Sequence, residues 1–155
     1  MHTVSPFRLI GPVLLAGAAA VAGNGLSTHA LAASGTAAAS ATPVHTLKLA
    51  KFGQVLVNAK GLTLYYYTPD KKGKPTCTSA CAQTWPPLLV SKSLKVQNIH
   101  LPGKCATVAF PSGGRQLTYN GWPLYTYVGD THPGATTGQK VQGIWFVATT
   151  KLKHA

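Results

Sequence analysis

The sequence is almost devoid of acidic residues. It contains two, Asp70 and Asp130, against 14 lysines and arginines, and its formal charge is +12. A mechanism built on paired carboxylates would therefore require these two to meet in space. Motifs typical of serine hydrolases, zinc peptidases, P-loop nucleotidases and dinucleotide-binding enzymes do not occur. We therefore expect a non-enzymatic protein, and a hydrolase of envelope polymers would have no recognisable catalytic set.

Long apolar runs are also missing beyond the N-terminus, which argues against a bundle of membrane-spanning helices. Charged residues make up 10% of the chain and hydrophobic residues 45%, so the chain is too apolar for a disordered basic tail. A length of 155 residues suits a single domain with a core of its own.

The N-terminus is typical of a secretory signal. Residues 1–32 combine an early positive charge, an apolar stretch and the cleavage sequence Ala30-Leu31-Ala32. We therefore expect a secreted protein, extracellular or periplasmic, with an uncleaved anchor as the alternative. Residues 33–46 are rich in Ala, Ser and Thr and predict a flexible leader, followed by one β domain over residues 47–152.

The positive charge comes almost entirely from lysine. Beyond the predicted signal the only arginine is Arg115, and the only lysine cluster is Lys71, Lys72 and Lys74. Nucleic-acid readers depend on arginine, so we do not expect a nucleic-acid partner. An anionic envelope polymer, a membrane surface or a mineral surface, including elemental sulfur, fits better. The shortage of carboxylates is equally consistent with acidic surroundings, as for an acidophilic bacterium, because carboxylates lose their charge there.

An internal repeat runs through the chain. Gly61-Leu62-Thr63-Leu64-Tyr65-Tyr66-Tyr67-Thr68-Pro69-Asp70 aligns without a gap on Gly121-Trp122-Pro123-Leu124-Tyr125-Thr126-Tyr127-Val128-Gly129-Asp130. We call the constant shift that places Gly61 on Gly121 the repeat offset. Both acidic residues of the protein take the same place in this repeat. Internal repeats set the architecture of a fold, so we expect two related halves.

Each repeat is predicted to be a β-hairpin. The alternation of Leu62, Leu64 and Tyr66 with Thr63, Tyr65 and Tyr67 has the period of a strand. Asn120-Gly121 is the preferred pair for a type I′ turn. With further strands expected near 107–110 and 144–149, the fold class is all-β. We expect a small antiparallel sandwich or open barrel built from two related hairpin repeats, near 53–70 and 113–130.

The repeated pattern Tyr65-x-Tyr67-x-x-Asp70 and Tyr125-x-Tyr127-x-x-Asp130 resembles a bacterial family. This is the secreted repeat of unknown function, or predicted lipoproteins with a Yx(FWY)xxD motif. Cys77-x-x-x-Cys81 with Trp85-Pro86-Pro87-Leu88, and Trp145 in the second repeat, extend the resemblance over about residues 50–150. The resemblance implies an exported envelope protein and brings no activity. The lipidated cysteine of a lipoprotein signal is missing, since Ala18 follows Leu15-Ala16-Gly17.

The motif residues admit structural and functional interpretations. Asp70 and Asp130 are expected to cap their turns by accepting backbone N–H groups, with a shared cation site or catalysis as alternatives. The four motif tyrosines, with Trp85 and Trp145, are expected to form an aromatic core or cross-strand ladder. The alternative is an aromatic platform for a sugar, a quinone or another flat ligand.

Three cysteines in an exported chain allow one intramolecular disulfide and leave one thiol. The resemblance implies the pair Cys77 and Cys81, so that Cys105 is free or links two chains into a homo-oligomer. The alternative function is an exported redox or electron-transfer accessory that uses the Cys pair, a haem or a metal. No cofactor is assigned, because the Cys spacing is not that of zinc or c-haem motifs, and His132 is the histidine most worth testing.

Overall fold

The computed structural model describes residues 42–70 and 73–155. The predicted signal over residues 1–32, most of the predicted leader, and Lys71 and Lys72 lie outside the described residues. The prediction for the end of the leader needs a correction, because strand β1 already begins at Val44. Its backbone pairs with β2 along its whole length, so the residues before 47 belong to the folded domain.

Strands dominate the described part of the chain. In chain order the elements are β1 (Val44–Leu49), β2 (Gly53–Asn58), β3 (Tyr65–Tyr67), α1 (Ala80–Thr84), β4 (Leu89–Val90), η1 (Val96–Asn98), β5 (Cys105–Ala109), β6 (Arg115–Tyr119), β7 (Trp122–Pro123), η2 (Val141–Gly143) and β8 (Trp145–Val147). The prediction of an all-β fold is confirmed. Across the two described ranges, no helix is long and apolar enough to cross a bilayer.

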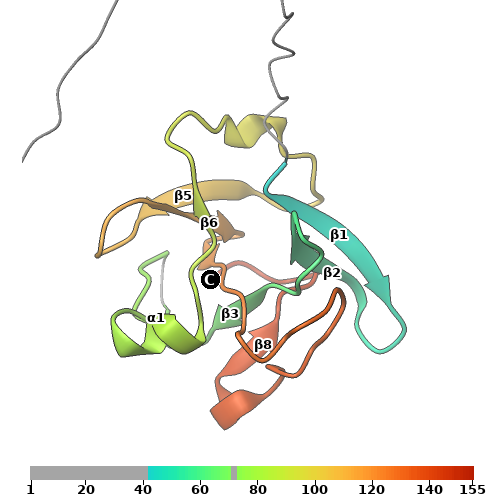
Figure 1. The fold of residues 1–155 in the computed structure, drawn as a ribbon. Coiled ribbons are helices and arrows are strands. Elements are labelled where there is room, and N and C mark those ends of the chain that lie inside the picture. The colour runs from blue at the N-terminus through green and yellow to red at the C-terminus, as the bar shows by residue number, and fades with distance from the viewer. Residues whose placement is uncertain (1–41, 71–72) are drawn as a thin grey trace, which may run out of the picture. The chain divides into compact units, whose positions relative to one another are not determined.

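The strands form three antiparallel groups, which are β1 with β2, β3 with β8, and β4-β6-β5 with β7 against β6. In Figure 1 the β1–β2 hairpin lies to the right, β5 and β6 to the left, and the β3–β8 pair below both. Single bridges such as Tyr65 to Tyr125 and Val55 to Thr149 join the groups. These bridges connect the two halves of the chain without closing the described strands into a barrel.

The hairpin turns follow from their sequences. Asn120 and Gly121, between β6 and β7, have φ of 49° and 86°. A type I′ turn requires positive φ at both central residues, which Asn tolerates and Gly adopts freely, so the predicted turn is confirmed. In the first repeat the turn is longer, and the Asn58 side chain accepts the N–H groups of Lys60 and Leu62.

The end of each repeat pairs with the hairpin of the other repeat. In the first half, the N–H of Thr68 donates to the carbonyl of Ile144 (3.0 Å) and the N–H of Ala148 to that of Leu64 (2.8 Å). The repeat offset reproduces this pattern in the second half. There Val128 donates to Thr84 (3.1 Å), and Leu88 to Leu124 (2.8 Å). The two repeats are therefore intertwined rather than placed side by side.

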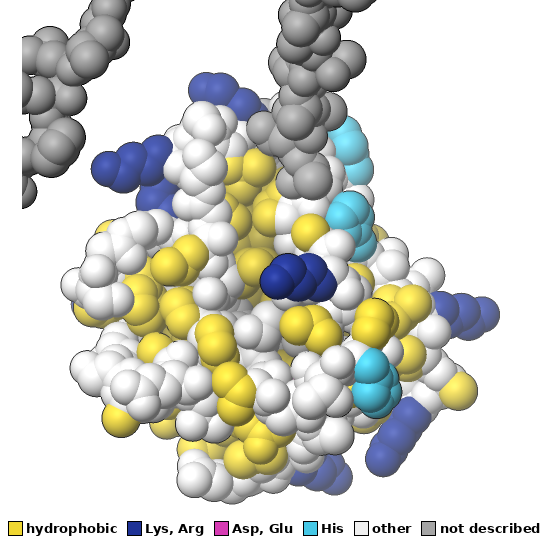
Figure 2. Space-filling view, in the orientation of Figure 1, with side chains coloured by type: hydrophobic (Ala, Val, Ile, Leu, Met, Phe, Trp, Pro, Cys, Tyr) yellow, Lys and Arg dark blue, Asp and Glu magenta, His cyan; other side chains and the backbone are white. Residues whose placement is uncertain are grey.

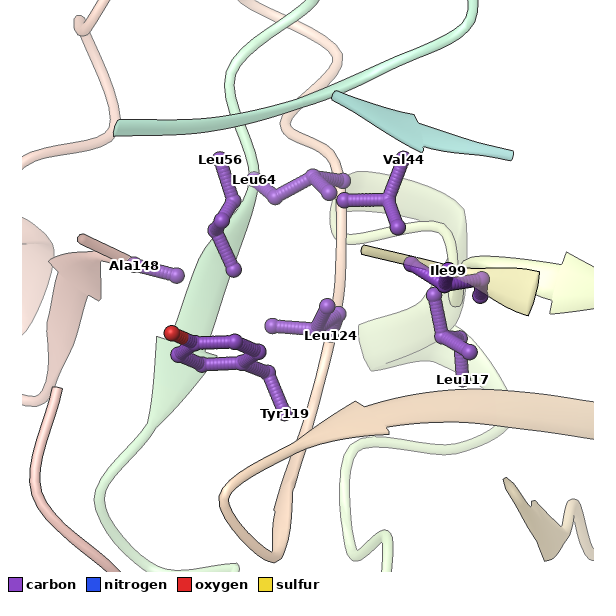
Figure 3. Close-up of a cluster of buried hydrophobic side chains, with 8 residues drawn as sticks. All are labelled: Val44, Leu56, Leu64, Ile99, Leu117, Tyr119, Leu124 and Ala148. Carbon is purple, nitrogen blue, oxygen red and sulfur yellow. The ribbon is translucent and has the colours of Figure 1, made fainter. Parts of the chain in front are cut away.

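Alternate residues of each motif strand enter two different hydrophobic clusters. Leu64 and Leu124 join the cluster of Figure 3, in which their side chains meet Leu56, Leu117 and the ring of Tyr119. The neighbouring residues Tyr65 and Tyr125 face the other way and join a cluster with Trp85 and Trp145. Both faces of each motif strand are therefore buried, which explains why two small hairpins suffice to hold the domain together.

The intertwined pairing predicts that neither half folds alone. Separate chains of residues 42–102 and 103–155, divided in the exposed loop before β5, should each lack a cooperative thermal transition. Each half would leave its motif strand without the hydrogen-bonding partner that the other half supplies. An equimolar mixture should regain the transition and the near-ultraviolet circular dichroism of the intact chain. A half that melts cooperatively by itself would contradict this pairing.

Candidate functional site

The two repeats are joined by a reciprocal pair of buried hydrogen bonds. The hydroxyl of Tyr65 donates to Oδ2 of Asp130, and the hydroxyl of Tyr125 donates to Oδ2 of Asp70, each at 2.6 Å. Beside them, the backbones of Tyr65 and Tyr125 exchange N–H to carbonyl bonds of 2.8 and 3.0 Å. Each motif tyrosine thus serves the aspartate of the opposite repeat.

Each aspartate also closes the loop that follows it. Oδ1 of Asp70 accepts the N–H and the hydroxyl of Thr76, at 2.7 and 2.6 Å. Oδ1 of Asp130 accepts the same two groups of Thr137, at 2.9 and 2.6 Å. Three donors per buried carboxylate are what a charge needs when it leaves water. The interpretation of the aspartates as turn caps captures this half of their role and misses the bond to the other repeat.

The two threonines were not predicted as site residues. They lie six and seven residues after their aspartates, so one repeat carries an extra residue in this loop. The repeat offset aligns Thr76 with Thr136, although Thr137 makes the bond. A search for a hydroxyl residue within one position of the repeat offset would have found both.

Burial controls the ionisation of these groups. It raises the pKa of Tyr65 and Tyr125 well above the ordinary value of a tyrosine, and the hydrogen bond that each donates to an aspartate raises it further. Burial also raises the pKa of the Asp70 carboxyl, which the bonds from Thr76 and Tyr125 lower part of the way back. The tyrosines therefore stay protonated as donors far into the alkaline range.

The alternative of a shared cation site receives no support from this geometry. The oxygens of Asp70 and Asp130 are engaged by tyrosine and threonine donors. Over residues 42–70 and 73–155, no three His, Cys, Asp or Glu side chains form a group that could hold a metal ion. His132 is exposed, and its ring Nδ1 lies 3.2 Å from the carbonyl oxygen of Pro133.

Four aromatic rings stack in a column through the centre of the second cluster. Trp85 and Trp145 lie parallel, with ring centroids 3.8 Å apart and planes 2° apart. Tyr127 stacks on the outer face of Trp85 and Tyr67 on that of Trp145, each at 4.3 Å. The order of the column is therefore Tyr127, Trp85, Trp145, Tyr67. The repeat offset aligns Tyr67 with Tyr127 and Trp85 with Trp145.

Of the four motif tyrosines, two are core residues and two are partly buried on the outside of the column, so they do not form an open platform. Tyr65 and Tyr125 are fully buried and meet Trp85 and Trp145 edge-on, at 5.4 and 5.2 Å. Close packing here also demands a glycine, since a Cβ at Gly138 would lie 2.7 Å from the indole of Trp85. These contacts agree with the interpretation of an aromatic core.

Two of the cysteines belong to the cluster that contains this column, and the third packs against the other hydrophobic cluster. Cys77 and Cys81 form the disulfide that the family resemblance implies, and Cys77 belongs to the same buried cluster as Trp85. Cys105 carries a free thiol that is half-buried on β5. Burial raises the pKa of this thiol, which disfavours the reactive thiolate.

The exposed side-chain charges of the described residues are all of one sign. Asp70 and Asp130 are buried, whereas every lysine of residues 42–70 and 73–155, Lys74 among them, is exposed together with Arg115. Figure 2 shows this on one face, where lysine and arginine side chains lie around the edge and near the centre and no acidic side chain is visible. The predicted binding residue Lys74 is thus one member of a coat that extends over the described surface.

The sequence matches a family model in two stretches, residues 46–89 and 106–149, which together cover more than half of the chain. The model describes a secreted repeat of unknown function. The chain belongs to this family. The starts of the two matched stretches, at positions 46 and 106, are related by the repeat offset. Searches of curated proteins and of solved structures found no match.

Loss of either tyrosine hydroxyl should destabilise the fold. We expect Tyr65→Phe and Tyr125→Phe each to lower the free energy of unfolding by about 1.5–3 kcal/mol, the usual range for a hydrogen bond to a charged group. Chemical denaturation measures this. Tyr127→Phe is the matched control, because no hydrogen bond of its hydroxyl occurs within the described ranges. Equal losses in all three variants would contradict the reciprocal bonds.

Acid should not weaken the fold through Asp70. Its folded-state pKa is raised above the unfolded value of about 3.9, so its contribution to stability is complete below that value and is lost as pH rises through the folded pKa. Compared with Asp70→Asn, which has no titrating carboxyl at this position, the wild type should therefore gain melting temperature or lose less of it from pH 7 to pH 4 at constant ionic strength. Asp70→Asn should remove the part of the pH dependence that comes from this carboxyl, although it lowers the melting temperature. A wild-type melting temperature that falls on acidification, while that of Asp70→Asn stays level, would show that folding lowers the pKa of Asp70 instead of raising it.

Proposed function

We propose that this exported domain is a non-enzymatic module that binds anionic polymers of the cell envelope or its surroundings. The observation that carries the proposal is the single sign of charge on its described surface. Both carboxylates of the sequence are buried in hydrogen bonds, so nothing acidic on a side chain opposes an approaching polyanion. Clusters of like charge raise the local concentration and association rate of an oppositely charged partner.

The geometry gives the redox alternative less support. Cys77 is 1% exposed and packs within the aromatic cluster, whereas exchange-active disulfides need access to an attacking thiolate. The bond between Cys77 and Cys81 holds the short helix α1 next to Trp85, which is a structural role. Acidic surroundings fit the proposal, since the side-chain charge of such a surface does not depend on carboxylates staying ionised.

The test is binding of the full chain to polyglutamate, which offers charge without sugar rings. Affinity should fall steeply as ionic strength rises, because the Debye length shortens from about 30 Å at 0.01 M salt to about 3 Å at 1 M. Fluorescence anisotropy of labelled polymer measures it. Absence of binding, or binding that salt does not change, would overturn the proposal.

The lysine coat also predicts how charge removal acts. Replacing Lys71, Lys72 and Lys74 with Gln should weaken binding to polyglutamate about as much as replacing Lys92, Lys95 and Lys104, since each set removes three charges. A loss confined to the first set would instead assign binding to the one lysine cluster of the sequence.

A further inference from the structure

A second set of aromatic rings lies outside the buried column. Tyr66 stands between Trp122 and Phe146, with ring centroids 5.0 and 5.8 Å away. All three side chains are only partly buried. We call Trp122, Tyr66 and Phe146 the outer aromatic row.

Tyr66 packs against the cluster of Figure 3, but the rings of this row have no aromatic counterparts in the other half of the molecule. Under the repeat offset, the equivalents of Tyr66, Trp122 and Phe146 are Thr126, Leu62 and Pro86. The buried rings behave differently, because the column and the Asp-bound tyrosines are aromatic in both halves. One half of the molecule therefore has no rings at these positions, so the contacts that the two repeats share do not account for the row.

A hollow of about 380 Å³ opens beside the row, with Tyr66 and Trp122 among its walls. Lys151, Lys153 and His154 line it as well and are exposed. The indole N–H of Trp122 donates to the carbonyl of Lys153 at 2.9 Å and fixes this segment next to the rings. Pockets of roughly 300–1,000 Å³ are the size that holds small ligands or single units of a polymer.

A second hollow of about 330 Å³ shares Thr149 and Lys151 with the first. It is lined by Lys48 and Phe52, and the ammonium of Lys51 lies 5.7 Å from the centroid of the Phe52 ring. Two adjoining hollows, each with an aromatic ring and lysines, suit a chain molecule that runs from one to the other.

We infer that these hollows form a cleft for an acidic polysaccharide. The C–H face of a sugar ring packs on an aromatic side chain, and its carboxylates or sulfates meet the lysines at the rim. A polyphosphate, or a purely acidic peptide such as polyglutamate, would use the lysines and leave the rings unexplained. This inference rests on the proposed function and names the polymer class and the place where it binds.

The test compares three polymers of matched length on the full chain. Polygalacturonate offers sugar rings with carboxylates, its methyl ester offers the rings without charge, and polyglutamate offers charge without rings. Polygalacturonate should bind most tightly at a given ionic strength. An ester that binds as well as the acid form would overturn the role of the lysines.

In two of the variants, the new residue is the one found at the equivalent position of the other repeat. Tyr66→Thr and Trp122→Leu should lower the affinity for polygalacturonate by roughly tenfold and leave that for polyglutamate unchanged. Trp122→Phe, which keeps a ring and loses the N–H, should retain most of the affinity and so separates the ring from the bond to Lys153. Near-ultraviolet circular dichroism and melting temperature confirm that each variant is folded. If one is not, Phe52→Ala in the second hollow provides an independent test and should likewise weaken binding of polygalacturonate alone.

Lysine variants complete the design. Lys151→Gln with Lys153→Gln should weaken polygalacturonate binding more than Lys92→Gln with Lys95→Gln, although both remove two charges. Equal binding of polygalacturonate and polyglutamate, with aromatic variants like the wild type, would overturn the cleft and leave the proposed function standing. Absence of binding to either polyanion would overturn both.

Discussion

The structure depends on two carboxylates that are buried because each is needed by both halves of the chain. Asp70 closes its own loop through Thr76 and accepts the hydroxyl of Tyr125 from the other repeat, and Asp130 does the same with Thr137 and Tyr65. Burying a carboxylate lowers the stability of the fold by several kcal/mol unless its oxygens accept hydrogen bonds. The fold therefore requires the donors from both repeats at once. The loops, hairpins and repeats are thereby coupled. Loss of one donor leaves a buried carboxylate with two of its three hydrogen bonds.

The aromatic column extends the same symmetry. Trp85 and Trp145 stack at the boundary between the repeats, each at the start of a segment that pairs with the opposite hairpin. A single repeat would expose its indole, its strand edge and its aspartate together. A chain of this kind arises naturally if an ancestral repeat formed a symmetric pair by exchange of its end segment and the two copies later became joined. The present chain keeps the reciprocal contacts and connects the copies through residues 90–105.

Local features of the fold could be predicted from the sequence, and long-range pairing could not. Period-two alternation and Asn120-Gly121 predict hairpins because side-chain direction and positive φ are properties of a few neighbouring residues. Each hairpin could pair with the end segment of its own repeat or with that of the other repeat. Because Trp85 and Trp145 take equivalent places in the two repeats, the sequence pattern does not distinguish these pairings. The sequence predicts that Asp70 caps its own loop, because the two are neighbours in the chain. It does not predict the bond from Tyr125, which lies 55 residues away. The outer aromatic row could not be predicted, because Tyr66 alternates with the motif residues and follows the same strand period.

Because both aspartates are buried, the charged side chains of the described surface are all basic. Each of the two carboxylates accepts three donors, while the charged side chains of the described surface are those of lysine and arginine. A surface of one sign repels copies of itself and attracts polyanions of many kinds, so charge alone gives little selectivity. In the cleft that we infer, rings that only one half of the molecule carries would add contacts that depend on shape and on the face of a sugar. The halves would then share the residues that stabilise the fold and differ at the residues that select a ligand.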